Sequence, residues 1–313
     1  AIGTEALKSQ DGSNYNVAVG DSAAENLTTG SESVFIGGLA GDAITTGTNN
    51  VAVGYAALSD EDAHGKNTAI GSNALQGLDA GADAYNVAVG YYAGRAVSTG
   101  VQNTLIGGLA GDGLTTGSDN VAVGTNALGK EDLGDGNIAI GVEALGQQGG
   151  PDYNVAVGYN AGKANDTGAI HVFVGNEAGV LTTAGDNYTF VGDQAGSALN
   201  YTGRNLTCLG YDSQPSAVGA SDELTLGSSG VATLRCAVNT ITLISDERDK
   251  TDIQDIDYGL DLIENLRPRK FTWDSRDGAK QGQKEIGFIA QELQEVDDEY
   301  LNFVQDNNPD KLE

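Results

Sequence analysis

A five-residue motif that closes on glycine recurs along this chain at a nearly constant interval, and this limits the fold more than any other feature. The motif reads Asn-Val-Ala-Val-Gly at 16–20, 86–90 and 154–158. Successive closing glycines lie 17 residues apart, except for one step of 19 and one of 18. They are Gly3, Gly20, Gly37, Gly54, Gly71, Gly90, Gly107, Gly124, Gly141, Gly158, Gly175, Gly192 and Gly210, and Gly227 follows in the weaker match ELTLG. This period predicts a repeat architecture in which each unit packs on its neighbours.

The residues before each glycine predict a short strand. In the first full copy they are Val17, Ala18 and Val19; the outer two positions are aliphatic or β-branched throughout, and the middle one is usually alanine. Alternation with a period of two and enrichment in β-branched residues are typical of a β-strand. Neither face is polar, so we expect one face to be buried inside the coil and the other against neighbouring chains.

The residues after each glycine predict a corner, a second short element and a loop. Alanine stands three residues after the glycine in nearly every copy, which indicates close approach of another backbone. Turns such as Thr-Thr-Gly at 28–30 follow, where glycine supplies a positive φ without a Cβ clash. Seventeen residues are too few for a βαβ crossover and too many for a hairpin. They predict one coil of a parallel β-solenoid whose coils stack about 4.8 Å apart.

Composition limits how such coils could be stable and what they could bind. Aromatic residues make up only 6% of the chain, which predicts a thin core, so we expect a homo-oligomer wound about one axis. Acidic residues outnumber basic residues by 44 to 16, a net charge of −28. This charge argues against nucleic acid as a partner, because phosphate binding needs basic patches. It suits a soluble surface with at most weak cation binding.

Two further features concern the ends of the chain and membranes. The chain opens on AIGTEAL, the middle of a repeat, and contains no Met, so we expect its true N-terminus to lie upstream. A secretion signal cannot be sought on such a start. No run of about 18 apolar residues occurs, so no transmembrane helix is expected.

These repeats resemble the head repeats of trimeric autotransporter adhesins, the YadA-like left-handed β-roll. They resemble more closely the related repeats of bacteriophage tail fibres, which run N-x-A-x-G-x-x-A-L. The resemblance covers residues 1–210 and implies a homotrimer with the first strand toward the three-fold axis. Adhesin heads typically have shorter coils, so the additional residues here are expected to lengthen the outer loops.

The sequence varies most in three of these loops, at 58–66, 128–136 and 145–153. Variable loops on a rigid scaffold are where receptor binding is expected. Several tyrosines follow or lie near the corner glycine, and the sequence leaves two interpretations open: an exposed aromatic stripe that grips sugars, or packing against the adjacent coil. They are Tyr55, Tyr91, Tyr92, Tyr159 and Tyr211.

The histidines and cysteines give no indication of a metal or cofactor site. His64 lies in a polar loop and His171 occupies the asparagine position of its repeat, and neither has a partner at ligand spacing. Cys208 and Cys236 match neither a zinc motif nor a disulfide framework. We interpret both as small packed residues, and we expect no metal and no cofactor.

The regular repeat fades after Gly210, and the composition changes again at Ser245. The predicted organisation is a repeat β-roll at 1–210, a short β stem at 211–244 and a small α+β domain at 245–313. In the last domain DYGLDLIENLRP predicts a helix, with Asp257 as its cap and Pro268 beyond its end. RKFTW at 269–273 predicts a strand, and KEIGFIAQELQEV predicts a strand followed by a helix. The apolar faces of the two helices carry Leu260, Ile263 and Leu266, and Ile289 and Leu293.

Ser245 and Lys250 are the candidate chemistry of the chain. A serine hydroxyl becomes a nucleophile when a base takes its proton, and a lysine can be that base where burial lowers its pKa. A serine and a lysine five residues apart are common in proteins. On spacing alone the pair therefore indicates a hydrated turn.

The sequence around this pair closely resembles the endosialidase-type C-terminal intramolecular chaperone over residues 245–297. The resemblance rests on SDERDKTDI followed by RPRKFTW and GFIAQEL. The S-D-x-R-x-K pattern of that family is matched by Ser245, Asp246, Arg248 and Lys250. The resemblance implies a domain that trimerises phage tailspikes and fibres and then cleaves itself once. Ser245 would be the nucleophile, Lys250 its base and Ile244–Ser245 the scissile bond. The long helices that usually follow in that family are not in this sequence, so we expect a truncated domain.

We therefore predict a structural homotrimeric phage tail fibre or receptor-binding protein, with no turnover activity and a single self-cleavage by the Ser–Lys dyad. Its expected partners are itself, the rest of the fibre upstream and a host cell-surface receptor such as a polysaccharide. Its expected location is the virion, outside the cell when functional and assembled in the host cytoplasm. Two alternatives stay open: a bacterial surface trimeric adhesin without a phage role, and a polysaccharide-degrading tailspike. Against the tailspike, no paired-carboxylate constellation is visible in the repeats.

Overall fold

The computed structural model divides into two compact units, Ala1–Arg235 and Cys236–Glu313. The residues that the structure describes are 1–12, 15–61, 63–130, 133–233, 264–274 and 281–295. Within these ranges no helix is both long enough and apolar enough to cross a membrane.

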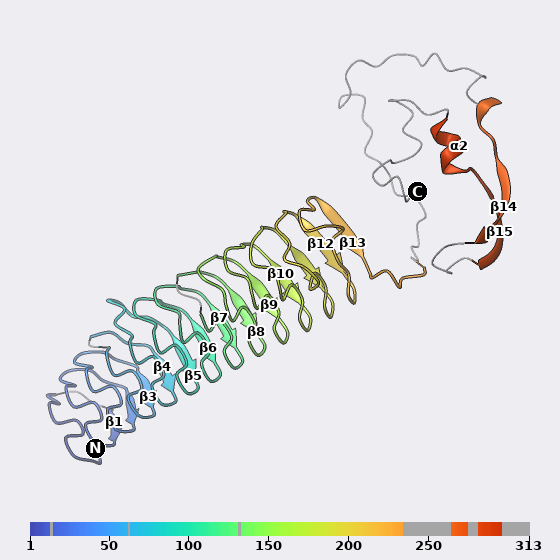
Figure 1. Ribbon diagram of the computed structural model, residues 1–313. Helices are drawn as coiled ribbons and strands as arrows, with labels where there is room; N and C mark the ends of the chain where they lie inside the picture. The colour runs from blue at the N-terminus through green and yellow to red at the C-terminus, as the bar shows by residue number, and fades with distance from the viewer. Residues whose placement is uncertain (13–14, 62, 131–132, 234–263, 275–280, 296–313) are drawn as a thin grey trace, which may run out of the picture. The chain divides into compact units, whose positions relative to one another are not determined.

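The first unit is a parallel β-solenoid built on one thirteen-stranded sheet. Figure 1 shows the strands stacked in chain order, each beside the strand one coil later. The strands are β1 (Val17–Val19), β2 (Val34–Ile36), β3 (Val51–Val53), β4 (Thr68–Ile70), β5 (Val87–Val89), β6 (Thr104–Ile106), β7 (Val121–Val123), β8 (Ile138–Ile140), β9 (Val155–Val157), β10 (Val172–Val174), β11 (Thr189–Val191), β12 (Leu206–Leu209) and β13 (Glu223–Leu226). The predicted solenoid of about 17-residue coils is therefore confirmed.

Every pair of neighbouring strands aligns equivalent positions of the repeat. Ala18 pairs with Phe35 between β1 and β2, and Thr207 pairs with Leu224 between β12 and β13. The coil of 19 residues keeps this alignment, because Ala69 still pairs with Ala88. Its two additional residues are therefore accommodated outside the strands. The parallel sheet continues through ELTL of β13, beyond residue 210 where the regular repeat ends in the sequence.

The corner glycine is required because two backbones meet there. Gly124 has a φ of 137°, and a Cβ on it would lie 2.5 Å from the carbonyl oxygen of Gly141 in the next coil. No side chain fits at that distance. The recurring glycine thus sets how closely the coils stack.

The segment after the corner forms a second ladder between coils. Ala57, three residues after Gly54, is fully buried, as is every alanine at this position from Ala23 to Ala195. The next residue, Leu58, has a φ of 54° and donates its N–H to the carbonyl of Ala74 at 3.0 Å. A left-handed conformation costs a non-glycine residue about 1–2 kcal/mol. Burial and hydrogen bonding between the coils offset that cost.

The interior is filled by two columns of complementary size. One column is the middle residue of each strand, and the other is the residue four after the corner glycine. Where the strand carries Phe35 the second position is Gly41, whose Cβ would lie 2.4 Å from the ring. Where the strand carries Ala52 the second position is Leu58, and both are fully buried. In these coils a large residue in one column is thus matched by a small residue in the other, while coils such as that of Ala18 and Ala24 carry small residues in both.

A buried asparagine precedes the strand in most coils, and we call the set the asparagine ladder. The Oδ1 of Asn120 accepts a hydrogen bond from the backbone N–H of Asn137 at 2.8 Å. Its Nδ2 donates to the carbonyl of Gly134, in the turn of the next coil, at 2.8 Å. The ladder consists of Asn50, Asn67, Asn86, Asn103, Asn120, Asn137 and Asn154, all fully buried. Each Oδ1 accepts from the backbone N–H of the next ladder position.

Toward the C-terminal end of the solenoid the ladder gives way to an aromatic cluster. His171 and Tyr188 occupy the asparagine position, with their ring centroids 4.7 Å apart. Phe173 and Phe190 fill the strand column, 5.6 Å apart. The cluster consists of His171, Phe173, Tyr188, Phe190 and Tyr201, all fully buried.

The described part of the second unit is a small α+β arrangement. Strands β14 (Arg269–Asp274) and β15 (Gln281–Gly287) pair antiparallel. Helix α2 (Ala290–Gln294) follows, with Ile289 as its N-cap. The strand expected at 269–273 and the strand and helix expected from KEIGFIAQELQEV are confirmed. Of the helix expected from DYGLDLIENLRP, residues 264–265 are helical, and residues before 264 lie outside the described ranges.

Candidate functional site

The residues predicted to carry the self-cleavage lie outside the part of the chain that the structure describes. They are Ile244, Ser245, Asp246, Arg248 and Lys250. The Ser–Lys dyad and its scissile bond therefore stay predictions.

The described residues of the second unit include one ion pair that ties its helix to its sheet. Arg269, at the start of β14, donates to both carboxylate oxygens of Glu292 in α2, at 2.8 and 2.6 Å. This two-fold contact lowers the pKa of Glu292. A planar guanidinium on a carboxylate fixes direction as well as distance. The pair therefore orients α2 against the first residue of β14.

The strands of the solenoid present one covered and one uncovered face. In β1 to β12 the residue before the last one is buried inside the coil, while the last residue points outward; Ile36, Ile106 and Ile140 are 39%, 40% and 39% exposed. We call these outward residues the aliphatic face. It consists of Val19, Ile36, Val53, Ile70, Val89, Ile106, Val123, Ile140, Val157, Val174, Val191 and Leu209. A contiguous exposed apolar surface of this extent marks an interaction site.

The tyrosines beside the corner glycines are exposed and do not form a continuous stripe. Tyr55, Tyr91, Tyr159 and Tyr211 are each more than half exposed, so none of them is buried against the adjacent coil. At least one coil without a tyrosine at that position separates each from the next. Tyr92 is half-buried and stacks on Tyr91 at 4.0 Å between ring centroids. Among the described tyrosines beside the corner glycines, a sugar can therefore contact a single ring or this one stacked pair.

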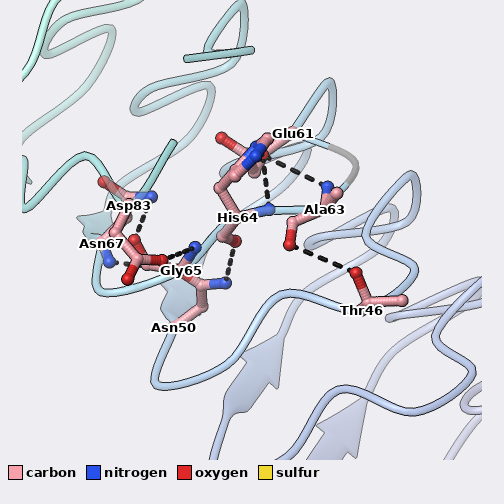
Figure 2. A network of polar contacts seen from close by, with 8 residues as sticks. All are labelled: Thr46, Asn50, Glu61, Ala63, His64, Gly65, Asn67 and Asp83. Atoms are coloured by element: carbon pink, nitrogen blue, oxygen red, sulfur yellow. Dashed lines mark hydrogen bonds and ion pairs between the residues drawn. The ribbon is translucent and has the colours of Figure 1, made fainter. Parts of the chain in front are cut away.

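One of the three variable loops holds a polar cluster that the sequence did not predict. Glu61 is fully buried, and its Oε1 lies 3.2 Å from Nδ1 of His64 (Figure 2). The backbone N–H groups of Ala63 and His64 donate to the same oxygen at 3.3 and 2.9 Å. Asp79, from the following coil, completes a group whose ligand-type atoms all lie within 4.8 Å of one another. The arrangement brings together a buried carboxylate, an imidazole and an exposed carboxylate.

The sequence does contain an indication of this cluster, which is the residue type at one position of the repeat. Glu61 stands seven residues after its corner glycine, where Ile44 and Leu78 stand in the coils on either side. Both of these are fully buried. Aligning the coils would have singled out this carboxylate between two buried aliphatic residues, although the same column also holds Glu131 and the buried polar residues Gln148, Asn165 and Thr182.

The second histidine and the described cysteine behave as buried structural residues. His171 accepts a hydrogen bond at Nδ1 from the backbone N–H of Tyr188 at 3.1 Å, and burial lowers the pKa of His171 to about 4. Burial raises the pKa of the Cys208 thiol to about 11. Cys208 is thus a packed residue, as expected, and Cys236 lies outside the described ranges.

Comparison with known families identifies the C-terminal segment. Residues 245–302 match the family described as chaperone of endosialidase. The match begins at the predicted nucleophile and contains β14, β15 and α2. No curated protein and no solved structure matches the chain. A match to this chaperone family beside a β-solenoid fits a tail-spike or fibre-type protein.

Proposed function

We propose that this chain is part of a homotrimeric bacteriophage tail fibre or receptor-binding protein, and that its C-terminal domain directs trimer assembly. The observation that carries the proposal is the aliphatic face, a row of outward Val, Ile and Leu side chains along the solenoid. The chaperone match at residues 245–302 supplies the second support.

Assembly through the aliphatic face is energetically sufficient. Covering the exposed part of a side chain such as Ile106, which is 40% exposed, contributes about 1–2 kcal/mol at 25 cal/mol per Å². Five residues of the face, Ile36, Ile70, Ile106, Ile140 and Leu209, are exposed to this extent, and the half-buried valines between them add smaller amounts. A three-fold arrangement covers the same face of every chain, because a closed symmetric assembly buries equivalent surfaces.

A chaperone at the C-terminus answers a folding problem that the repeat creates. Neighbouring coils are so similar that chains displaced by one repeat would match almost as well as chains in register. A C-terminal domain that trimerises first would fix the register before the solenoids associate. Its removal afterwards would make the assembled fibre kinetically hard to reverse.

Within this proposal Ser245 acts once as the nucleophile and Lys250 as its base, with Asp246 and Arg248 completing the motif. The bond cut is Ile244–Ser245, so the solenoid unit and the chaperone separate after folding. The fibre works in the virion, outside the cell, after assembly in the host cytoplasm. Its variable loops face a host receptor such as a polysaccharide, and its N-terminal end joins the rest of the fibre.

A bacterial surface trimeric adhesin is the second candidate, since it would use the same solenoid and the same aliphatic face. The chaperone segment favours the fibre, because that family serves tailspikes and fibres. A polysaccharide-degrading tailspike is the third candidate. Hydrolysis of capsular polysaccharide by the purified trimer would favour it over a purely structural fibre.

The experiment combines oligomeric state and mass in the same samples. The protein is expressed from its complete reading frame as wild type, as Ile106→Asp and as Ser245→Ala. Sedimentation equilibrium should give a trimer of the solenoid product for wild type, and the mass should show cleavage before Ser245. Ile106→Asp should weaken the trimer at least tenfold, because it places a charge on a buried apolar face.

The control is Ile170→Asp, an even more exposed isoleucine in a loop position that Asp119 occupies in another coil. Ile170→Asp should leave the trimer unchanged, and Ser245→Ala should give an uncleaved trimer. A monomeric wild type, or equal effects of Ile106→Asp and Ile170→Asp, would sink the proposed assembly. A trimer whose chains stay uncleaved in both wild type and Ser245→Ala would contradict only the proposed self-cleavage.

A further inference from the structure

We propose that Glu61, His64 and Asp79 bind one divalent transition-metal ion, with Zn²⁺ the best match, and that this ion joins two consecutive coils at the variable loop 58–66. The site goes beyond the structural role of the fibre. It is also more specific than the weak surface cation binding expected from the acidic composition.

The first support is the place of Glu61 in the fold. Ile44 and Leu78, at the same position of the neighbouring coils, are fully buried, and so is Glu61. Its Oε2 is buried and has no hydrogen-bond partner among the described residues. An ionised carboxylate is costly in such a place unless a cation or a full set of hydrogen bonds compensates it. A bound cation supplies that compensation.

The second support is that the ligands are held in position by the backbone around them. Asn50 donates to the carbonyl of His64 at 3.0 Å, and Thr46 donates to the carbonyl of Ala63 at 3.2 Å (Figure 2). The N–H of Asp79 donates to the carbonyl of Ser98 at 2.8 Å. His64 and Ala63 are therefore anchored to the coil before them, and Asp79 is anchored to the coil after its own. Little order is lost when an ion binds to ligands that are already placed.

The third support is the spacing of the ligand atoms. Zinc binds imidazole nitrogen and carboxylate oxygen at about 2.0–2.2 Å, which puts tetrahedral ligands about 3.3–3.6 Å apart. Nδ1 of His64 and Oε1 of Glu61 are 3.2 Å apart. Asp79 lies at the exposed side of the cluster and needs only a small movement, since all ligand atoms lie within 4.8 Å. Three protein ligands leave one position for water.

The fourth support is local charge. With a neutral imidazole, Glu61 and Asp79 carry two negative charges, which a divalent ion neutralises. The nearby cation Lys66 is engaged elsewhere, 2.8 Å from Oδ2 of Asp83 and 2.8 Å from the hydroxyl of Tyr85. An imidazole ligand favours zinc over Mg²⁺ and Ca²⁺, which prefer oxygen ligands only.

The test uses the whole chain, stripped with a chelator and dialysed, with metal chlorides as the probes. Titration calorimetry with Zn²⁺ should give one ion per chain, and metal analysis after gel filtration should give the same ratio. Visible absorption of the Co²⁺ form should show tetrahedral coordination. Glu61→Gln, His64→Gln and Asp79→Asn should each lower the affinity for Zn²⁺ at least tenfold. Ca²⁺ and Mg²⁺ should not compete at equal concentration.

Two matched controls separate this site from the acidic surface. Glu131→Gln changes a glutamate at the same repeat position four coils later, where the residue equivalent to His64 is Gly134. Asp83→Asn removes a neighbouring carboxylate that pairs with Lys66. Both should leave the affinity for Zn²⁺ within twofold of wild type. Circular dichroism checks that each variant folds, and Asp79→Asn, an exposed change, keeps the test valid if Glu61→Gln does not fold.

Three results would overturn the proposal. One is zinc binding that the site substitutions do not weaken. Another is an equal loss of binding in Glu131→Gln and in Glu61→Gln. The third is displacement of Zn²⁺ by equimolar Ca²⁺, which would indicate diffuse binding to the acidic surface.

Discussion

The asparagine ladder and the aromatic cluster occupy the same positions of the same coil, yet they hold it together by different means. In the ladder, each side chain both accepts from the next coil's backbone and, in all but Asn67, donates to its turn carbonyl. In the cluster, those two tasks are divided. His171 keeps the acceptor role, at 3.1 Å from the N–H of Tyr188, and Tyr188 keeps the donor role, at 2.8 Å from the carbonyl of Gly203.

The difference teaches that a coil keeps its backbone path with only one of the two hydrogen bonds where a buried ring adds packing. An aromatic side chain satisfies one bond and adds volume, while asparagine satisfies both and adds little. The buried middle residue of the strand also differs between the two regions. It is Ala122 or Ala139 in the ladder region, and Phe173 or Phe190 in the cluster. Ladder coils are thus specified by polar pairing, and cluster coils by packing of rings 4.7–6.2 Å apart.

The largest expected effect comes from removing a ring in the cluster. Phe190→Ala should lower the free energy of unfolding by about 3–5 kcal/mol per chain, because it deletes a buried ring and leaves a cavity. Phe190 contacts three other rings, those of Phe173, Tyr188 and Tyr201. Denaturant unfolding followed by circular dichroism measures the change.

The matched control for that change is Phe35→Ala, in a coil whose phenylalanine has no aromatic neighbour among the described residues. It should cost less than Phe190→Ala, since aromatic pairs contribute about 0.5–1.5 kcal/mol beyond the area they bury. Equal losses of unfolding free energy would mean that contacts between the rings contribute nothing beyond the area that each ring buries.

The next effect tests the histidine at the boundary between the two regions. Burial lowers the pKa of His171 from 6.5 to about 4. Between these two pH values the imidazole is protonated in the unfolded chain but stays neutral in the folded chain. Stability is therefore complete above pH 6.5 and falls as the pH drops toward 4. The loss attributable to this residue amounts to about 3 kcal/mol per chain at the acid end.

His171→Asn should remove this part of the acid sensitivity by extending the ladder one coil further. The comparison to make is the slope of unfolding free energy against pH between 6.5 and 4 in wild type and variant. The carboxylates titrate in both proteins, so only the difference between the slopes reports on His171. Identical slopes would show that the proton does enter the folded coil.

The sequence predicts the features that repeat locally and misses those that depend on stacking. The closing glycine and the Val-Ala-Val pattern predicted the strand and the corner. The same residue type at one position of every repeat indicates the same backbone conformation and burial in every coil. The positive φ of Leu58 was not predictable, since hydrogen bonds from the next coil impose it on a residue that disfavours it. Burial of one strand face inside the coil was predictable from the apolar pattern, whereas burial of the other face against neighbouring chains stays a prediction.

The candidate sites differ in the same way. Glu61 and His64 are three residues apart in one loop, and Asp79, 18 residues after Glu61, joins them because consecutive coils stack. The repeat period places Glu61 and Asp79 on neighbouring coils, but the spacing alone does not show that their side chains meet. Ser245 and Lys250 carry no signal on spacing alone, and their assignment rests on the family resemblance, which the match at 245–302 supports at the level of the domain.

The smallest effects come from single hydrogen bonds and define what the ladder contributes. Asn120→Ala removes the acceptor for the N–H of Asn137 and the donor for the carbonyl of Gly134. Leaving buried groups unpaired should cost about 2 kcal/mol per chain, or somewhat more, in unfolding free energy. Asn120→Ser should recover part of this loss. Ser33 occupies the same position in the second coil, and its hydroxyl accepts from the N–H of Asn50 at 3.0 Å.

Tyr188→Phe completes the series, because it removes only the donor half of the same pairing and keeps the ring. It should cost about 1 kcal/mol, less than Asn120→Ala, and denaturant unfolding of all three variants on one scale measures the order. Asn120→Ala should therefore lose the most, with Asn120→Ser and Tyr188→Phe both below it. If Tyr188→Phe instead cost as much as Asn120→Ala, the turn carbonyl alone would carry the stability. The backbone bond between ladder positions would then contribute nothing of its own to holding the coils in register.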